Sequence, residues 1–139
     1  MGDVRGVIVN EARARQLRDF SGLTYGTITP TDIDLCMEYR DRSFVFAEIK
    51  MPGHEIPKGQ RIALERIVDG LRAAGKVAVL FLVENNQPDP EIPTAVSSCI
   101  VLKFYCNRRW RDGGGKTPKE WMDRVIANAS KSVNGGSLP

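Results

Sequence analysis

The stretch TDIDLCMEYRDRSFVFAEIK, residues 31–50, decides the fold because it predicts a β-hairpin and a cluster of charges in the same place. The segments 33–39 and 43–50 have the alternating or apolar patterns of strands, and the polar run Arg-Asp-Arg lies between them. If Tyr39 and Ser43 close the turn, the strands pair antiparallel and the numbers of opposite residues add up to 82.

This register brings charged side chains together at the open end of the hairpin. Asp34 then lies opposite Glu48, and Asp32 lies opposite Lys50. Two facing carboxylates repel each other, so the pattern indicates either a divalent cation between them or a salt-bridge cluster that includes Lys50. Because side chains alternate along a strand, the opposite face of the hairpin is apolar and carries Ile33, Leu35, Met37, Tyr39, Val45, Ala47 and Ile49.

The rest of the chain predicts an α/β protein with a mixed sheet and helices on its faces. Segment 57–75 has an apolar stripe with helical period, and 76–84 is a continuous apolar run, typical of a strand covered on both faces. Thr117 begins a second helix with a capping box. We expect the order α-β-β-β-α-β-β-α, with further elements at 10–20 (helix), 23–29 (strand), 97–106 (strand) and 107–116 (loop).

The length of 139 residues and the net charge of +3 fit a single domain. We expect a core over about residues 10–106, a basic loop and a C-terminal helix over 107–131, and a frayed tail over 132–139. The longest apolar run, Val77 to Val83, is too short to span a membrane, and the N-terminus lacks a signal-peptide pattern. We therefore expect a cytoplasmic protein without a membrane partner.

The cysteines predict no disulfide framework, because their number is odd and their spacing is wide. Without a Cys-x-x-Cys pair, a zinc site from the three thiols and the single histidine is disfavoured. We expect reduced thiols and a surface histidine at Cys36, Cys99, Cys106 and His54.

The charged end of the hairpin resembles the signature of the PD-(D/E)XK nuclease superfamily. In that signature an acidic residue on one strand is followed on the next by Glu-x-Lys, here Asp34 and then Glu48-Ile49-Lys50. Gln60, early in the following helix, fits the place of a glutamine in VRR-NUC-like members. The predicted element order over residues 10–84 also resembles that restriction-endonuclease-like fold, which Holliday junction resolvases share.

The resemblance implies a Mg²⁺- or Mn²⁺-dependent endonuclease that acts on DNA. Asp34, Glu48 and the carbonyl of Ile49 would bind the metal, Lys50 would orient the attacking water, and Gln60 would position Lys50 or the phosphate. The family resemblance supplies these roles, whereas the spacing of the residues supplies only the facing carboxylates.

Two further acidic residues leave the metal site open to alternatives. Glu11 is a weaker candidate for a metal or water contact, because many members use an acid from the first helix. Asp32 is the literal Pro-x-Asp acid of the signature, but we prefer Asp34, which faces Glu48 in the inferred register.

A basic aromatic cluster after the last predicted strand is a candidate nucleic-acid contact. Arginines suit phosphates and a tryptophan ring can stack on a base, although Trp110 would also serve to cover the sheet edge. The residues are Arg108, Arg109, Trp110, Arg111 and Lys116.

Two other classes of function compete with the nuclease. The runner-up is a non-catalytic nucleic-acid-binding or assembly module on a nuclease-like fold, and the third is a structural interaction protein. The form of the DNA is open, and cutting both strands of a duplex would favour a homodimer.

Overall fold

The computed structural model describes residues 5–132, and the chain divides into two compact units, residues 1–31 and 32–139. The predicted tail at 132–139 lies outside the described residues apart from the last residue of a helix. Within the described residues no helix has the length and apolar character needed to cross a membrane.

The first unit contains little regular structure. The helix predicted over 10–20 was wrong in its length, because helix α1 (Glu11–Ala14) is a single turn. Asn10 caps it as predicted and accepts a hydrogen bond from the Arg13 N–H at 3.0 Å. A 3₁₀ turn follows at Ser21–Leu23.

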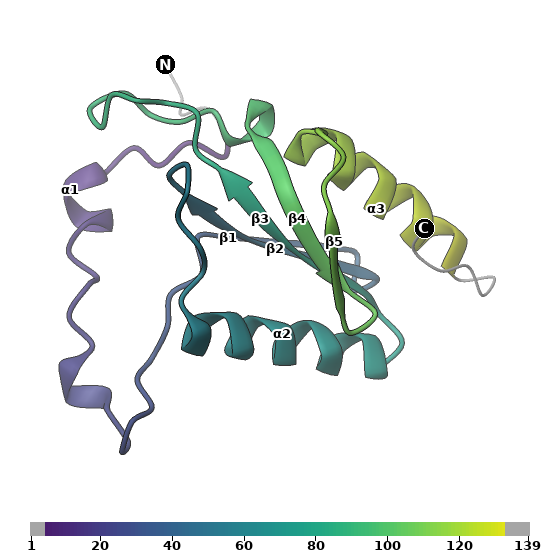
Figure 1. Cartoon of the computed structure of the whole chain (residues 1–139), viewed down its shortest axis with the longest axis horizontal. Coiled ribbons are helices and arrows are strands. Elements are labelled where there is room, and N and C mark those ends of the chain that lie inside the picture. Colours follow the sequence, from purple (N-terminus) through teal and green to yellow (C-terminus); the bar gives the residue numbers. More distant parts are fainter. Residues whose placement is uncertain (1–4, 133–139) are drawn as a thin grey trace. The chain divides into compact units, whose positions relative to one another are not determined.

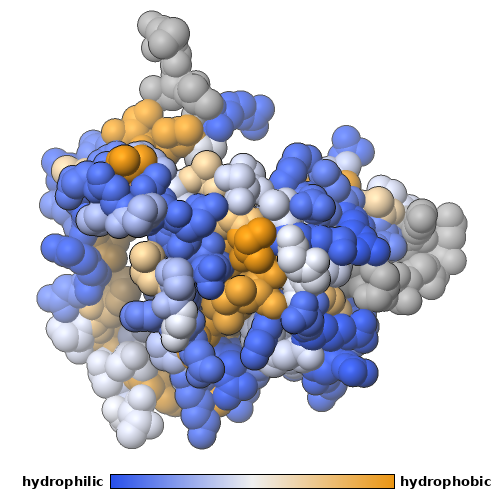
Figure 2. Space-filling view, turned by 45° about the horizontal axis from the view of Figure 1, so that its top comes forward, coloured by the Kyte–Doolittle hydropathy of each residue, from blue (hydrophilic) through white to orange (hydrophobic). Residues whose placement is uncertain are grey.

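The predicted strand at 23–29 was wrong. Tyr25 and Ile28 pair only with each other, across a tight turn in which Gly26 has a φ of +63°. Because the turn folds the segment back on itself, it adds no strand to a sheet. Several apolar side chains of this unit are more than half exposed, and Figure 2 shows that apolar side chains reach the molecular surface; the exposed residues include Val7, Ile8, Val9, Leu17 and Tyr25.

The second unit is built on a five-stranded mixed sheet, which confirms the predicted α/β class. Neighbouring strands follow the order of the sequence, and only β2 and β3 are parallel, joined by a helical crossover. The strands are β1 (Leu35–Tyr39), β2 (Ser43–Lys50), β3 (Val77–Glu84), β4 (Ile100–Cys106) and β5 (Arg109–Asp112).

The predicted register of the β1–β2 hairpin is confirmed. Tyr39 pairs with Ser43 and Leu35 with Ala47, so opposite residue numbers add up to 82 along the whole ladder. The turn between the strands includes left-handed backbone at Arg40, with a φ of 50°. Since the side-chain period is two, this register fixes which face every residue of β2 occupies.

One helix covers each face of the sheet, and Figure 1 shows α2 (Lys58–Ala73) and α3 (Pro118–Ser132) on opposite sides. Strand β3 lies between them and is buried along Val77 to Val83, as its continuous apolar sequence predicted. The core under α2 contains Phe46, Leu64, Val68, Ala78, Leu80 and Tyr105, and the larger core under α3 includes Val45, Phe81, Val83, Phe104, Trp121 and Val125.

The predicted loop at 107–116 was wrong in its first half, because residues 109–112 form β5. Asn107 and Arg108 make a two-residue turn with φ values of 51° and 62°, the left-handed geometry that matches the twist of a hairpin. Asparagine suits the first of these positions, and this signal was available in the sequence. The predicted capping box is confirmed, since the Thr117 hydroxyl and the Glu120 carboxylate exchange hydrogen bonds with each other's backbone N–H.

Gly113 connects β5 to α3 at a point where no side chain fits. A Cβ atom there would lie 1.8 Å from the Val101 carbonyl oxygen. The Gly113 carbonyl in turn accepts a 2.9 Å hydrogen bond from the indole of Trp121, which fixes α3 on the sheet.

We expect Gly113→Ala to lower the free energy of unfolding by about 2–3 kcal/mol, because backbone must move to admit the methyl group. Gly70→Ala is the matched control, since a Cβ there meets no atom within 4 Å and alanine favours the interior of α2 by about 0.5–1 kcal/mol. Urea denaturation of both variants tests this, and equal midpoints would contradict it.

Candidate active site

Glu48 is the buried centre of the candidate site. Its side chain lies on the α2 face of β2, and the residue is only 1% exposed. Its Oε1 atom accepts a 2.9 Å hydrogen bond from Gln60, but its Oε2 atom is buried and has no hydrogen-bond partner among residues 5–132. A buried carboxylate oxygen without a donor is costly, so this atom calls for a proton or a cation.

Asp34 lies beside Glu48, as the register predicted. Its Oδ2 atom accepts a hydrogen bond from the Ile49 N–H at 2.8 Å, which holds the carboxylate across the hairpin just beyond the last paired residue of β1. The N–H and C=O of a strand residue point to the same side, so the Ile49 carbonyl is also directed toward Asp34. Asp34 itself is exposed, so the carboxylate pair has one buried and one open end.

Gln60 links the site to the start of α2. Its Nε2 atom donates to Glu48 Oε1, to the Asp32 carbonyl at 3.1 Å and, more weakly, to the Asp32 carboxylate at 3.5 Å. The amide therefore fixes the orientation of the Glu48 carboxylate and ties the segment before β1 to the helix. Position 60 is in the first turn of α2, where the positive end of the helix dipole favours nearby carboxylates.

Lys50 is the nearest positive charge, on the same face of β2 as Glu48. Its charge lowers the pKa of Glu48, yet no ion pair among the described residues joins it to Glu48 or Asp34. A salt-bridge cluster, the alternative that the sequence left open, is therefore not formed by these three side chains.

The electrostatics of Glu48 are dominated by its burial. Burial is the largest of the causes that together raise the pKa of Glu48 to about 8. The next is Asp34, to which a proton on Glu48 would be hydrogen-bonded and whose charge also disfavours ionisation. Asp32 raises the pKa less, and Lys50 offsets only part of the total. Without a metal, the pair Asp34–Glu48 therefore keeps a proton at neutral pH.

The donor set fits a hard divalent cation. Asp34 and Glu48 supply two carboxylates, and the Ile49 carbonyl supplies a neutral oxygen on the same side. No group of three or more His, Cys, Asp or Glu side chains that could hold a metal ion occurs among residues 5–132. Mg²⁺ does not need one, since it commonly binds one or two carboxylates and keeps several waters.

The remaining predicted ligand, Glu11, belongs to the first unit. It lies in the first turn of α1, is exposed, and forms an ion pair with Arg15 at 3.6 Å. Its assignment to the metal site stays a prediction.

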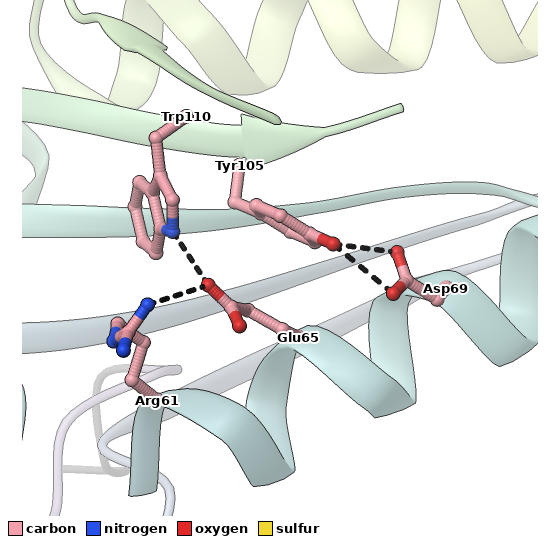
Figure 3. Close-up of polar contacts among 5 residues, drawn as sticks. All are labelled: Arg61, Glu65, Asp69, Tyr105 and Trp110. Atoms are coloured by element: carbon pink, nitrogen blue, oxygen red, sulfur yellow. Dashed lines mark hydrogen bonds and ion pairs between the residues drawn. The ribbon is translucent and has the colours of Figure 1, made fainter. Parts of the chain in front are cut away.

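Trp110 packs inward instead of extending from a loop. Figure 3 shows it beside Tyr105, on the side of the sheet that faces α2. The two rings lie 5.5 Å apart, and the indole donates a 2.6 Å hydrogen bond to Glu65, which also pairs with Arg61. The indole N–H and the apolar ring of Trp110 thus both help to hold β5 to α2.

The other members of the basic cluster are spread over both faces of the β4–β5 hairpin. Arg108 is exposed in the turn and Arg109 is exposed on β5, whereas Arg111 and Lys116 are partly covered. Lys116 lies 5.6 Å from the centre of the Trp121 ring, in a cation–π contact on the α3 side. The nucleic-acid role of this cluster stays a prediction.

The histidine and the cysteines do not gather into a site. His54 is exposed in the loop before α2, and Cys36 is exposed on β1. Cys99 and Cys106 are buried thiols of the core under α3.

Comparison of the chain with protein-family models, with curated proteins and with solved structures gave no match.

We expect the metal-free protein to lose stability as the pH rises from about 4.5 to about 8. In this window the unfolded chain releases the Glu48 proton while the folded protein retains it, so the folded state binds more protons. Glu48→Gln should flatten the profile and stabilise the protein at pH 8 by on the order of 3 kcal/mol. Thermal unfolding in chelator, with Glu55→Gln as the exposed control, measures this; a wild-type profile already flat across the window would contradict it.

We expect Trp110→Ala to lower the free energy of unfolding by about 2–3 kcal/mol, because it removes a packed ring and leaves Glu65 without its indole donor. Trp110→Phe should cost about 1–2 kcal/mol, since it removes mainly the hydrogen bond. Arg109→Ala, on the same strand but exposed, is the control and should change stability by less than about 0.5 kcal/mol. Equal melting temperatures for all three would show that the ring does not hold the sheet to α2.

Proposed function

We propose that Asp34, Glu48 and Lys50 form the centre of a metal-dependent phosphodiesterase that hydrolyses DNA, in the manner of the PD-(D/E)XK nucleases whose motif they resemble. The observation that supports this most is the buried Oε2 atom of Glu48, which has no donor among residues 5–132 and lies next to a second carboxylate. Such a pair is destabilising by itself, so its presence at the open end of a hairpin is explained by a cation.

Mg²⁺ or Mn²⁺ would be held by the carboxylates of Asp34 and Glu48 and by the Ile49 carbonyl. When bound, the ion supplies a Lewis acid for the phosphate and lowers the pKa of a water ligand. Replacing the shared proton by the ion removes the repulsion between the two carboxylates.

The chain's own residues position the reactants. Lys50 has no ion pair with either carboxylate, so its ammonium is available to orient a water and to balance charge that develops on a phosphate. Gln60 holds Oε1 of Glu48 and thereby directs Oε2 away from itself. The exposed Asp34 leaves one side of the pair open to a phosphodiester.

DNA is the substrate that the motif resemblance favours, and a homodimer is the assembly that double-strand cleavage would require. The competing proposal is a nucleic-acid-binding or assembly module that keeps the fold without cleaving. Metal binding decides between them, because a non-catalytic module needs no divalent ion at Glu48.

We expect Glu48→Gln and Asp34→Asn each to reduce cleavage of plasmid DNA by at least about a hundredfold while the protein stays folded. Isothermal titration with Mn²⁺ should show binding to the wild type and to Glu55→Gln, and none to the two site variants. Full cleavage by folded Glu48→Gln, or no Mn²⁺ binding by the wild type, would remove the proposal.

We expect Asp32→Asn to reduce cleavage less than Asp34→Asn does. Asp34 is anchored by the Ile49 N–H and raises the pKa of Glu48 more strongly than Asp32, whose carboxylate receives a 3.5 Å contact from Gln60. Rates for both variants with Mg²⁺ test the assignment, and the reverse order would make Asp32 the metal ligand.

A further inference from the structure

The last turn of α2 and the β4–β5 turn enclose a hollow of about 400 Å³ at the opposite end of the helix from Glu48. Five residues line it: Asp69, Arg72, Ala73, Asn107 and Arg108. Two guanidinium groups and one amide are the donors expected of a site for an oxyanion.

We propose that this hollow binds a phosphate group, either free or in the backbone of a nucleic acid. Arginine donors match the oxygens of phosphate in a planar, paired geometry. The nucleic-acid form of the ligand rests on the proposed function, whereas the phosphate site does not.

Arg72 lines the hollow and carries a buried donor. Its Nη1 atom is buried and has no hydrogen-bond partner among residues 5–132. A buried charged donor without an acceptor is costly, and Arg72 lines the hollow, so an oxyanion that enters the hollow is the acceptor that we assign to this guanidinium. None of the ion pairs among the described residues includes Arg72 or Arg108.

Two features of the hollow oppose an anion, namely Asp69 and the C-terminal end of α2. The helix end carries a partial charge of about −0.5. Asp69 already accepts from the Tyr105 hydroxyl at 2.9 and 3.0 Å, as Figure 3 shows, and so is held against the sheet. Arg72 and Arg108 together outweigh these two negative charges.

The surroundings add positive charge at this end of the sheet. Arg72 and Arg111 both lower the pKa of Cys106 against the larger effect of burial. Arg108 also lowers the pKa of Tyr105, although burial, Asp69 and Glu65 raise it more. Several arginine charges therefore act on the same edge of the core, which suits a polyanion better than a neutral ligand.

The distance between the hollow and Glu48 sets the minimum length of a ligand that could contact both. A helix rises about 1.5 Å per residue, so Gln60 and Arg72 are about 18 Å apart along α2. Duplex DNA advances about 3.4 Å per base pair, so one duplex reaching both places would span about five base pairs. A duplex longer than this could contact both places at once, whereas a shorter one could contact only one of them.

The first experiment titrates inorganic phosphate into the metal-free full chain and follows the backbone amides by NMR. We expect shifts at Asn107 and Arg108, and at least tenfold weaker binding in both Arg72→Gln and Arg108→Gln. Arg66→Gln, an exposed arginine of α2 outside the hollow, is the control and should bind like the wild type. No phosphate binding, or equal binding by all variants, would overturn the proposal and leave Arg72 as a complement to the helix dipole.

The second experiment identifies the source of the phosphate with a duplex of about 20 base pairs in metal-free buffer. For a nucleic-acid backbone, Arg108→Gln should weaken binding about tenfold and reduce the salt slope of log affinity by about 0.9. If phosphate binding is lost but DNA affinity is unchanged, the ligand is a free phosphate compound and the site stands. Neither measurement uses the metal, so failure here is separate from failure of the nuclease proposal. If Arg72→Gln fails to fold, Arg108→Gln in the exposed turn decides alone.

Discussion

A carboxylate that is almost fully buried beside another carboxylate is the constraint on which the site depends. Glu48 lies on a central strand with an apolar core on either side, so it cannot turn to water without leaving its face of the sheet. A proton, a cation or a hydrogen-bond donor must therefore be present at that point, and within the described part of the chain only the Glu48 Oε1 atom has a donor. The burial of β2 in the apolar core therefore produces the chemistry of the site.

The position of the site follows from how three elements meet. The β1–β2 register brings Asp34 to Glu48, and the parallel pairing of β2 with β3 buries Glu48 by placing the apolar residue Leu82 beside it. Helix α2 starts just after β2 and contributes Gln60 from its first turn. Each element would have an ordinary structural role alone, and their convergence at the carboxyl end of two parallel strands is what concentrates polar groups there.

Much of this was predictable because hydrophobic period determines both register and face. The hairpin, the buried strand β3, helix α2 and the capping box at Thr117 all had complete local signals, and the facing of Asp34 and Glu48 followed from the hairpin alone. The wrong predictions fell where the local sequence pattern of a segment did not indicate which other strand it pairs with. Residues 23–29 look like a strand but pair internally, and the short strand β5 has a single apolar residue, Trp110, whose basic neighbours suggested a nucleic-acid contact instead.

The two ends of α2 carry opposite partial charges, and each end lies near side chains of the opposite sign. At its start, the positive end of the helix dipole faces carboxylates, whose excess negative charge the proposed cation would relieve. At its end, the negative end of the dipole faces arginines, and the buried Nη1 atom of Arg72 lacks an acceptor among residues 5–132. A phosphodiester chain carries a negative charge at every phosphate. It could therefore contact the arginines at the end of α2 directly, whereas at the carboxylates near the start of α2 it would need a bridging cation. If both proposals hold, one helix separates contacts that hold a polyanion from contacts that act on it, and its length sets the distance between them.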